Sequence, residues 1–174
     1  KLNKYQRYLF RLDQRRRRNL RSKYITLLGE RAENIIPLNL TKFELWEECK
    51  QTCPFTGSNI TLSDLFTDMI QVVYINPWCN SLNDSHWNKT LCVRSFAEKI
   101  KDSSPYDYFN KHEPEQWGTV LKRAARLFSN TKDFPSSYRK FKRFIKKHNY
   151  RNPLKHQMRD SNVLSREVMT FLTR

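Results

Sequence analysis

The sequence predicts an α+β domain, in which a small core containing β-strand is flanked by mostly helical segments. Apolar residues recur at helical spacing towards both ends of the 174-residue chain, which is typical of amphipathic helices. The middle instead carries a short β-branched run followed by a polar loop. Only 3 glycines are present, which argues against the Gly-rich phosphate loops of nucleotide-binding folds.

The first predicted element is a basic helix over residues 1–28, with Gly29 as its C-cap. Four consecutive arginines, Arg15–Arg18, cover every side of such a helix, so they cannot all be buried. Residues 31–40 contain Pro37 and are predicted to form a connector. The chain therefore enters its middle part from a charged helix and a loop.

A short helix is expected next, because Thr41 and Glu44 have the spacing of a capping box. Residues 53–57 have the composition of a turn, and residues 60–66 predict a further short helix or turn. These elements lead into the only clear strand signal of the chain.

That strand is predicted over residues 71–75, because the segment is β-branched and aromatic and stops before Pro77. Residues 78–85 are rich in Asn and Ser and predict a loop. A helical segment is expected to begin over residues 86–93 and to continue past Ala97.

Three further segments have helical spacing of apolar residues: 113–129, 136–148 and 153–172. The second is strongly basic, and its apolar side chains are expected to be buried. They are Tyr138, Phe141, Phe144 and Ile145.

Charge is the strongest signal of the composition, with 33 Lys and Arg against 17 Asp and Glu, a net charge of +16. Solubility needs only about 2–8 net charges in a small domain, so nucleic acid is the expected partner. Residues 1–40 carry +8, residues 41–118 carry −4 and residues 119–174 carry +12. The side chains predicted to contact phosphate are Arg15, Arg16, Arg17, Arg18, Lys89, Lys140, Lys142, Arg143, Lys146 and Lys147.

The four cysteines, Cys49, Cys53, Cys79 and Cys92, form no C-x-x-C pair, so a zinc ribbon is poorly supported and buried free thiols are expected. No signal peptide is visible, and no apolar run is long enough to span a bilayer. The first residue is Lys1 rather than Met, so we expect the chain to be a piece of a longer protein.

Residues 72–92, VVYINPWCNSLNDSHWNKTLC, resemble the HNH nuclease domain of the RNA-guided CRISPR type II effector, which has a ββα-metal core. In that family an acidic residue and a His end the strand, and a Pro follows three positions after the His. A Ser-Leu-Asp-Asp-Ser loop and an Asn-Lys-x-Leu motif, expected here on a helix, come next. Pro77, Ser81–Ser85 and Asn88–Cys92 match this pattern without gaps.

The resemblance covers nearly the whole chain. Residues 45–48 and 53–57 are similar to the family's opening helix and first turn, and Ser104-Pro105-Tyr106 is similar to the segment after the core. The implied parts are a basic linker helix entering the domain (1–40), an HNH-like ββα core (41–110), a helical basic extension (111–150) and a linker leading back to a RuvC-like domain (151–174).

The chain departs from the family at three functional positions. In active HNH domains the strand His is the general base, and the preceding acidic residue and an Asn on the helix hold one Mg²⁺. Tyr74 stands at the His position, and a phenol that titrates near ~10 is a poor base at neutral pH. Val73 and Ala97 stand at the ligand positions and offer no oxygen. The resemblance thus implies a degenerate catalytic site with no metal ligands and no expected cofactor.

Three other residues are candidates for a substitute site: Asp84, His86 and Asn88, with His86 as a displaced base. A metal needs convergent oxygens, and only Asp84 brings a charge, so loop and capping roles are expected for them instead. Two alternatives stay open, namely an active Mg²⁺-dependent HNH nuclease with this displaced site, and a non-catalytic nucleic-acid-binding module.

The resemblance also implies partners and a location. The partners are guide RNA and target DNA, with the RuvC-like and recognition domains of the parent chain, and the heteroduplex would lie beside this domain. The implied location is the cytoplasm of a prokaryote, with no membrane contact.

Overall fold

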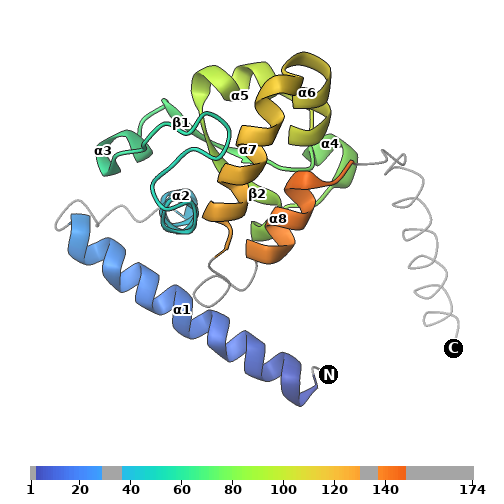
Figure 1. Ribbon diagram of the computed structural model, residues 1–174. Coiled ribbons are helices and arrows are strands. Elements are labelled where there is room, and N and C mark those ends of the chain that lie inside the picture. The colour runs from blue at the N-terminus through green and yellow to red at the C-terminus, as the bar shows by residue number, and fades with distance from the viewer. Residues whose placement is uncertain (1–2, 29–36, 130–136, 148–174) are drawn as a thin grey trace, which may run out of the picture.

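The computed structural model describes residues 3–28, 37–129 and 137–147 (Figure 1). The predictions for Gly29 and for residues 153–172 lie outside these ranges. The helices are α1 (Lys4–Leu28), α2 (Pro37–Glu48), α3 (Leu62–Leu65), α4 (Trp78–Ser81), α5 (Arg94–Ile100), α6 (Pro105–His112), α7 (Pro114–Leu127) and α8 (Ser137–Ile145), with a 3₁₀ turn, η2, at His86–Asn88.

Two strands, β1 (Ile70–Tyr74) and β2 (Lys89–Val93), form an antiparallel hairpin around which the helices are arranged (Figure 1). The register places Ile70 opposite Val93 and Tyr74 opposite Lys89. The chain between the strands contains α4 and η2. A mostly helical α+β domain with one hairpin confirms the predicted fold class.

The second strand corrects the helix expected from residue 86 onwards. Only His86–Asn88 forms a 3₁₀ turn, and the helix begins at Arg94, after β2. Thr90, Leu91 and Cys92 are all fully buried, so β2 is buried on both faces and shows no alternation. A short run of this kind cannot be told from a buried helix by its periodicity, and pairing with β1 decides the outcome.

Two helix starts also differ from the predictions, and proline explains both. α2 begins at Pro37, within the predicted connector, so Thr41 lies inside the helix rather than at its cap. α6, which the sequence did not predict, begins at Pro105 after the N-cap Ser104, whose hydroxyl accepts the Asp107 N–H. Proline suits the first helical position because its missing N–H would have no partner there.

Buried side chains from Tyr24 to Phe144 form one core cluster. Phe144, on α8, is fully buried, with its ring centre 5.3 Å from that of Phe55. The predicted burial of Tyr138 is wrong, because that side chain is 54% exposed, and Ile145 is 37% exposed. The inward positions of α8 are Ser137, Lys140 and Phe144, at helical spacing, so Tyr138 falls on the outer face.

The basic first helix is confirmed as α1, which runs along the lower edge of the molecule beside α2 (Figure 1). Tyr24 anchors it, with 2% exposure and with its ring edge-on to Phe43 and Phe66, at centre-to-centre distances of 5.3 and 5.8 Å. Of the described helices, none has both the length and the apolar character needed to cross a bilayer.

Candidate functional site

Tyr74, at the expected general-base position, ends β1 directly opposite Lys89, the first residue of β2. Its phenol donates a 2.6 Å hydrogen bond to Asp84 Oδ1, and Lys89 Nζ lies 2.7 Å from the same oxygen. The hydrogen bond to Asp84 and burial raise the pKa of Tyr74 to about 12. The hydrogen bonds from Lys89 and Tyr74 lower the pKa of Asp84. At neutral pH the phenol is therefore a proton donor to a charged carboxylate.

The two positions where metal ligands would stand are used for packing. Val73 is half-buried and packs against the hydrophobic core, and Ala97, at 8% exposure, belongs to that core. α5, which carries Ala97, contacts both strands of the hairpin. Neither side chain has an atom that can bind a cation.

His86 lies against α2. Its Nε2 is 3.1 Å from Glu48 Oε2, its Nδ1 is 3.8 Å from Glu44 Oε2, and the side chain is 17% exposed. The two ring nitrogens thus face two carboxylates that lie one helical turn apart on α2. This arrangement fixes the ring in place. The candidate displaced base is therefore held by α2, and not by Tyr74 or Asp84.

Glu48 is the centre of a buried polar cluster that the sequence did not reveal. Its side chain has no exposure, accepts a 2.6 Å hydrogen bond from Ser137 Oγ and forms an ion pair with Lys140. Burial would raise the pKa of Glu48, but the charge of Lys140 and the contact with His86 hold it at about 2. Lys140 is itself fully buried, which corrects the expectation that it contacts phosphate.

Asn88, the third candidate substitute, is fully buried and fastens the loop between the strands. Its Oδ1 accepts the Asn76 N–H at 2.9 Å and Arg143 Nη1 at 3.1 Å, while its Nδ2 donates to the carbonyls of Asn76 and Asn83, both at 2.9 Å. The side-chain amide is fully used in these four bonds. The role of Asn88 in the structure is to hold the loop in one conformation.

These residues do not fit a Mg²⁺ ion. The structure brings Asp84 to Tyr74 and Lys89, His86 to α2, and Asn88 into the loop, so their ligand atoms do not converge. Within residues 3–28, 37–129 and 137–147, no group of three or more His, Cys, Asp or Glu side chains is arranged to hold a metal. Magnesium needs several oxygens in near-octahedral geometry, which this donor set does not provide.

Apart from Lys89 on β2, the other basic residues predicted to contact phosphate lie on α1 and on or just after α8. On α1, Arg15, Arg17 and Arg18 are exposed, whereas Arg16 is half-buried and pairs with Glu44. At the C-terminal end of the described chain, Lys146 and Lys147 are exposed. Two basic surfaces result, one on α1 and one on and just after α8.

Aromatic rings accompany the basic side chains of α8. Lys142 Nζ lies 4.6 Å from the centre of the exposed Tyr138 ring. The guanidinium carbon of Arg143 lies 4.0 Å from the centre of the Trp87 ring, and burial lowers the pKa of Arg143. A cation above an aromatic face is held in a defined position, which limits its conformational freedom.

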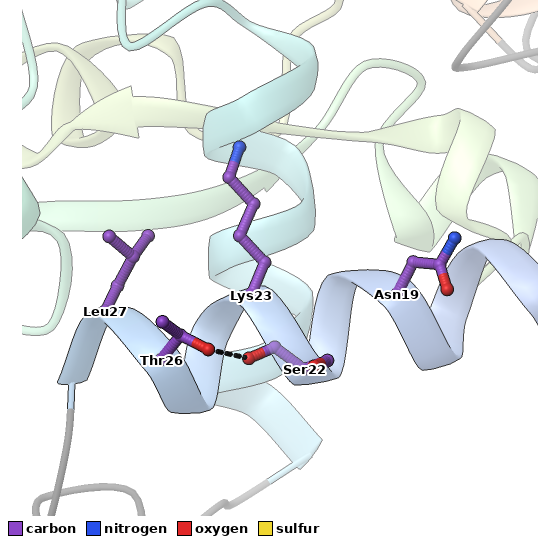
Figure 2. A pocket seen from close by; sticks show the side chains of 5 residues that line it. All are labelled: Asn19, Ser22, Lys23, Thr26 and Leu27. Atoms are coloured by element: carbon purple, nitrogen blue, oxygen red, sulfur yellow. Dashed lines mark hydrogen bonds between the residues drawn. The ribbon is translucent and has the colours of Figure 1, made fainter.

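An open hollow of about 390 Å³ lies along α1 (Figure 2) and is separate from the predicted site residues. Lys23 crosses from it towards α2, where its Nζ lies 2.6 Å from Glu47 Oε2. The other side chains that line the hollow are short or apolar, and none of them is charged. Among them, the Thr26 hydroxyl donates a hydrogen bond to the Ser22 carbonyl. All of the residues that line the hollow belong to α1. Its lining residues are Asn19, Ser22, Lys23, Thr26 and Leu27.

All four cysteines are free thiols, as predicted. Cys49, Cys53 and Cys92 are buried, but the predicted burial is wrong for Cys79, which is exposed on α4. Burial raises the pKa of Cys49 to about 11, so that thiol is unreactive at neutral pH.

Residues 53–106 match the family model for HNH endonucleases. A curated relative, the CRISPR-associated endonuclease Cas9 of Campylobacter jejuni, is 28% identical over 90 residues. The aligned stretch covers 51% of this chain but only 9% of that protein. The chain is therefore much shorter than the relative that it matches.

Solved structures of Cas9 proteins share the fold. Streptococcus thermophilus Cas9 in complex with the GGAA PAM matches 87% of this chain and 15% of its own, with a TM-score of 0.63 and 14% identity. The type II-C Cas9 of Actinomyces naeslundii matches 84% of this chain and 16% of its own, with a TM-score of 0.58 and 12% identity. The structural similarity therefore extends well beyond residues 53–106.

Proposed function

Because the chain contains an HNH endonuclease domain that resembles the HNH domain of Cas9, we propose that it is the HNH-like domain of an RNA-guided, DNA-targeting CRISPR effector. It lies beside the heteroduplex of guide RNA and target DNA and does not cleave the target strand. Residues 41–110 form the HNH-like core and residues 111–150 its basic extension. Residues 1–40 and 151–174 connect it to a RuvC-like domain.

One observation supports the loss of cleavage most directly, the hydrogen bond from Tyr74 to Asp84. A general base needs a lone pair and a pKa near the working pH. Tyr74 stands where the base is expected, but its pKa is raised to about 12 and its O–H donates a hydrogen bond to Asp84. With Val73 packed against the core and Ala97 within it, no side chain at the three positions can activate water or hold a cation.

Binding does not need the lost groups. Phosphate contacts require only Lys, Arg and backbone N–H groups, and they supply most of the non-specific affinity for nucleic acid. The exposed arginines of α1 and the lysines after α8 provide them. The domain thus keeps the means to lie against a nucleic acid after losing the means to cut it.

Restoring the three positions tests this proposal. In the full parent protein, Val73→Asp, Tyr74→His and Ala97→Asn are introduced together, and target-strand cleavage is measured in Mg²⁺. The matched control carries Tyr74→Phe together with the same changes at positions 73 and 97. The test variant and the control variant therefore disturb the core equally. Circular dichroism checks that both variants fold. We expect cleavage by the first variant and none by the control or the unaltered protein.

Cleavage of the target strand by the unaltered protein, abolished by His86→Ala, would establish the displaced site instead. A parent reading frame without RuvC-like segments on either side would indicate a binding module that works without a guide.

A further inference from the structure

Tyr74 and Lys89 form an anion-binding pair that the chain fills with its own Asp84 carboxylate. We propose that a phosphodiester of a bound nucleic acid strand takes the place of that carboxylate. This inference rests on the proposed function, because it names the chemical group of the nucleic acid that the former catalytic position now recognises.

The two donors are those that a phosphate oxygen accepts. A phenol O–H and an ammonium group meet at one anionic oxygen, Asp84 Oδ1, at 2.6 and 2.7 Å. Charge-assisted bonds of this kind are the usual contacts between proteins and the phosphate backbone. A non-bridging phosphodiester oxygen carries the same charge and lone pairs as the carboxylate oxygen.

The donors are fixed, whereas the carboxylate is not. Tyr74 and Lys89 are directly opposite each other in the hairpin, so strand pairing holds both on the same face. Lys89 Nζ lies 5.6 Å from the centre of the Tyr74 ring, which adds a second restraint on the ammonium group. The pair therefore exists independently of the group that occupies it.

Asp84 can leave without loss of the loop. Its side chain is 67% exposed, and the bonds that fasten the loop belong to its neighbours. The Asn83 carbonyl accepts from Asn88 Nδ2, and the Asn83 side chain accepts the Ser85 N–H at 3.0 Å. Rotation of the Asp84 side chain breaks only its own contacts with the pair.

The vacated position would favour an anion over water. The Lys89 side chain is only 18% exposed with Asp84 in contact, so departure of Asp84 would leave a largely buried side chain without its counter-charge. A partly buried cation is unfavourable without a counter-charge. A phosphodiester restores the charge balance and also accepts the hydrogen bond from Tyr74. Chloride could restore the charge balance but is the weaker hydrogen-bond acceptor.

The experiment uses the 174-residue chain and a fluorescein-labelled single-stranded DNA oligonucleotide, with affinity measured by anisotropy. Asp84→Asn removes the internal competitor. Asp102→Asn, at an exposed position after α5, changes the net charge equally and serves as the matched control. We expect Asp84→Asn to bind about threefold to fivefold more tightly than the control, the effect expected for one exposed ion pair. Adding Tyr74→Phe, which carries no charge change, should remove that gain.

A second measurement does not depend on the DNA-binding surfaces. Dimethyl phosphate is titrated into the Asp84→Asn variant while the ¹⁵Nζ signal of Lys89 is followed by NMR, with Asp84→Asn/Tyr74→Phe as the control. A saturable shift that the control lacks supports the anion site.

Equal affinities of Asp84→Asn and Asp102→Asn, in a chain that binds DNA, would overturn the anion site and leave the proposed binding function intact. If the unaltered chain does not bind DNA, the proposed function fails and the titration decides the anion site by itself. Equal dimethyl phosphate shifts with and without the Tyr74 hydroxyl would also overturn it.

Discussion

Glu48 keeps a negative charge in the core, because Lys140, His86 and Ser137 surround its carboxylate. An ion pair without solvent is stable only when hydrogen bonds satisfy its remaining atoms, and here Ser137 supplies one. Loss of one partner alone would leave a buried charge uncompensated, at a cost of about 3–5 kcal/mol. His86 is thus bound into a cluster that supports the fold.

Removing both members of the pair should flatten the acid dependence of stability. The folded-state pKa of Glu48 is about 2, below its ordinary value of 4.5. The ionised Glu48 carboxylate therefore makes its full contribution to the free energy of unfolding at pH values above 4.5. That contribution is lost as the pH falls from 4.5 towards 2. Between pH 6 and pH 3 we expect Glu48→Gln/Lys140→Met to lose on the order of 1–2 kcal/mol less free energy of unfolding than the unaltered chain.

Urea unfolding at the two pH values measures this difference. Glu115→Gln, at an exposed position in the first turn of α7, is the control and should retain the normal acid dependence. An acid dependence of Glu48→Gln/Lys140→Met equal to that of the control would contradict the assignment to Glu48.

At the scale of elements, α1 is held to the domain by the buried Tyr24, by Leu20 and Leu28, which pack against the same core, and by a few ion pairs. Tyr24 is buried between Phe43 and Phe66, whereas Arg16 and Lys23 form ion pairs with Glu44 and Glu47 on α2. Partly exposed ion pairs contribute little, so burial of the Tyr24 ring supplies most of the attachment.

Tyr24→Ala should release α1 while the hairpin core stays folded. Truncating a buried aromatic side chain costs about 3–5 kcal/mol, and the loss falls on the α1–α2 contact. Hydrogen exchange with mass spectrometry should show faster exchange over Lys4–Leu28 and unchanged protection of β1 and β2. The control is Tyr8→Ala, at a position that is 57% exposed on the same helix. Matching exchange rates over α1 in the two variants would refute the anchoring role.

The elements that the sequence predicted are those with a complete local signal. α1, α7 and α8 have helical spacing of apolar residues, and β1 is β-branched with a proline three residues after its end. β2 was predicted as helix, because a five-residue strand buried on both faces has no alternation. α6 has no such signal in the sequence, because its Pro105 can either end a helix or stand at its first position, and here it stands at the first position.

The candidate site, too, could be predicted only where the sequence itself carries the signal. The positions of Val73, Tyr74 and Ala97 came from motif order along the chain, which the sequence displays directly. The contact of Tyr74 with Asp84 and the cluster around Glu48 depend on side chains that meet only after folding. Lys140 was predicted to be exposed for this reason, since its partner lies on α2, far away in the sequence.

At the scale of the whole molecule, positive charge lies on the two ends of the described chain, on α1 and around α8. Each phosphate contact releases condensed counterions, so the logarithm of the affinity for duplex DNA falls with the logarithm of the salt concentration by about 0.9 per contact. The salt dependence therefore reports how many basic residues touch the backbone.

Replacing two exposed arginines of α1 should reduce that slope. Arg15→Gln/Arg18→Gln is expected to lower its magnitude by about 2 for duplex DNA, with weaker binding at every salt concentration. Lys99→Gln/Lys111→Gln, on exposed positions of α5 and α6, removes the same charge and should change the slope much less. Anisotropy titrations across a salt series measure both, and an equal change in the two variants would rule out α1 as a specific contact surface.

The ion pair between Glu48 and Lys140 joins residues that are 92 positions apart. This separation determines when the nascent chain can fold during its synthesis. α2 leaves the ribosome long before α8, and until then Glu48 has neither Lys140 nor Ser137, while Phe55 lacks the ring of Phe144. We expect the nascent chain to stay open to proteases until α8 has emerged, and then to close cooperatively. Proteolysis of ribosome-bound chains of increasing length would show that step, and protection of a chain ending at residue 106 would refute it. The smallest unit that folds is then much longer than the segment by which its family is recognised.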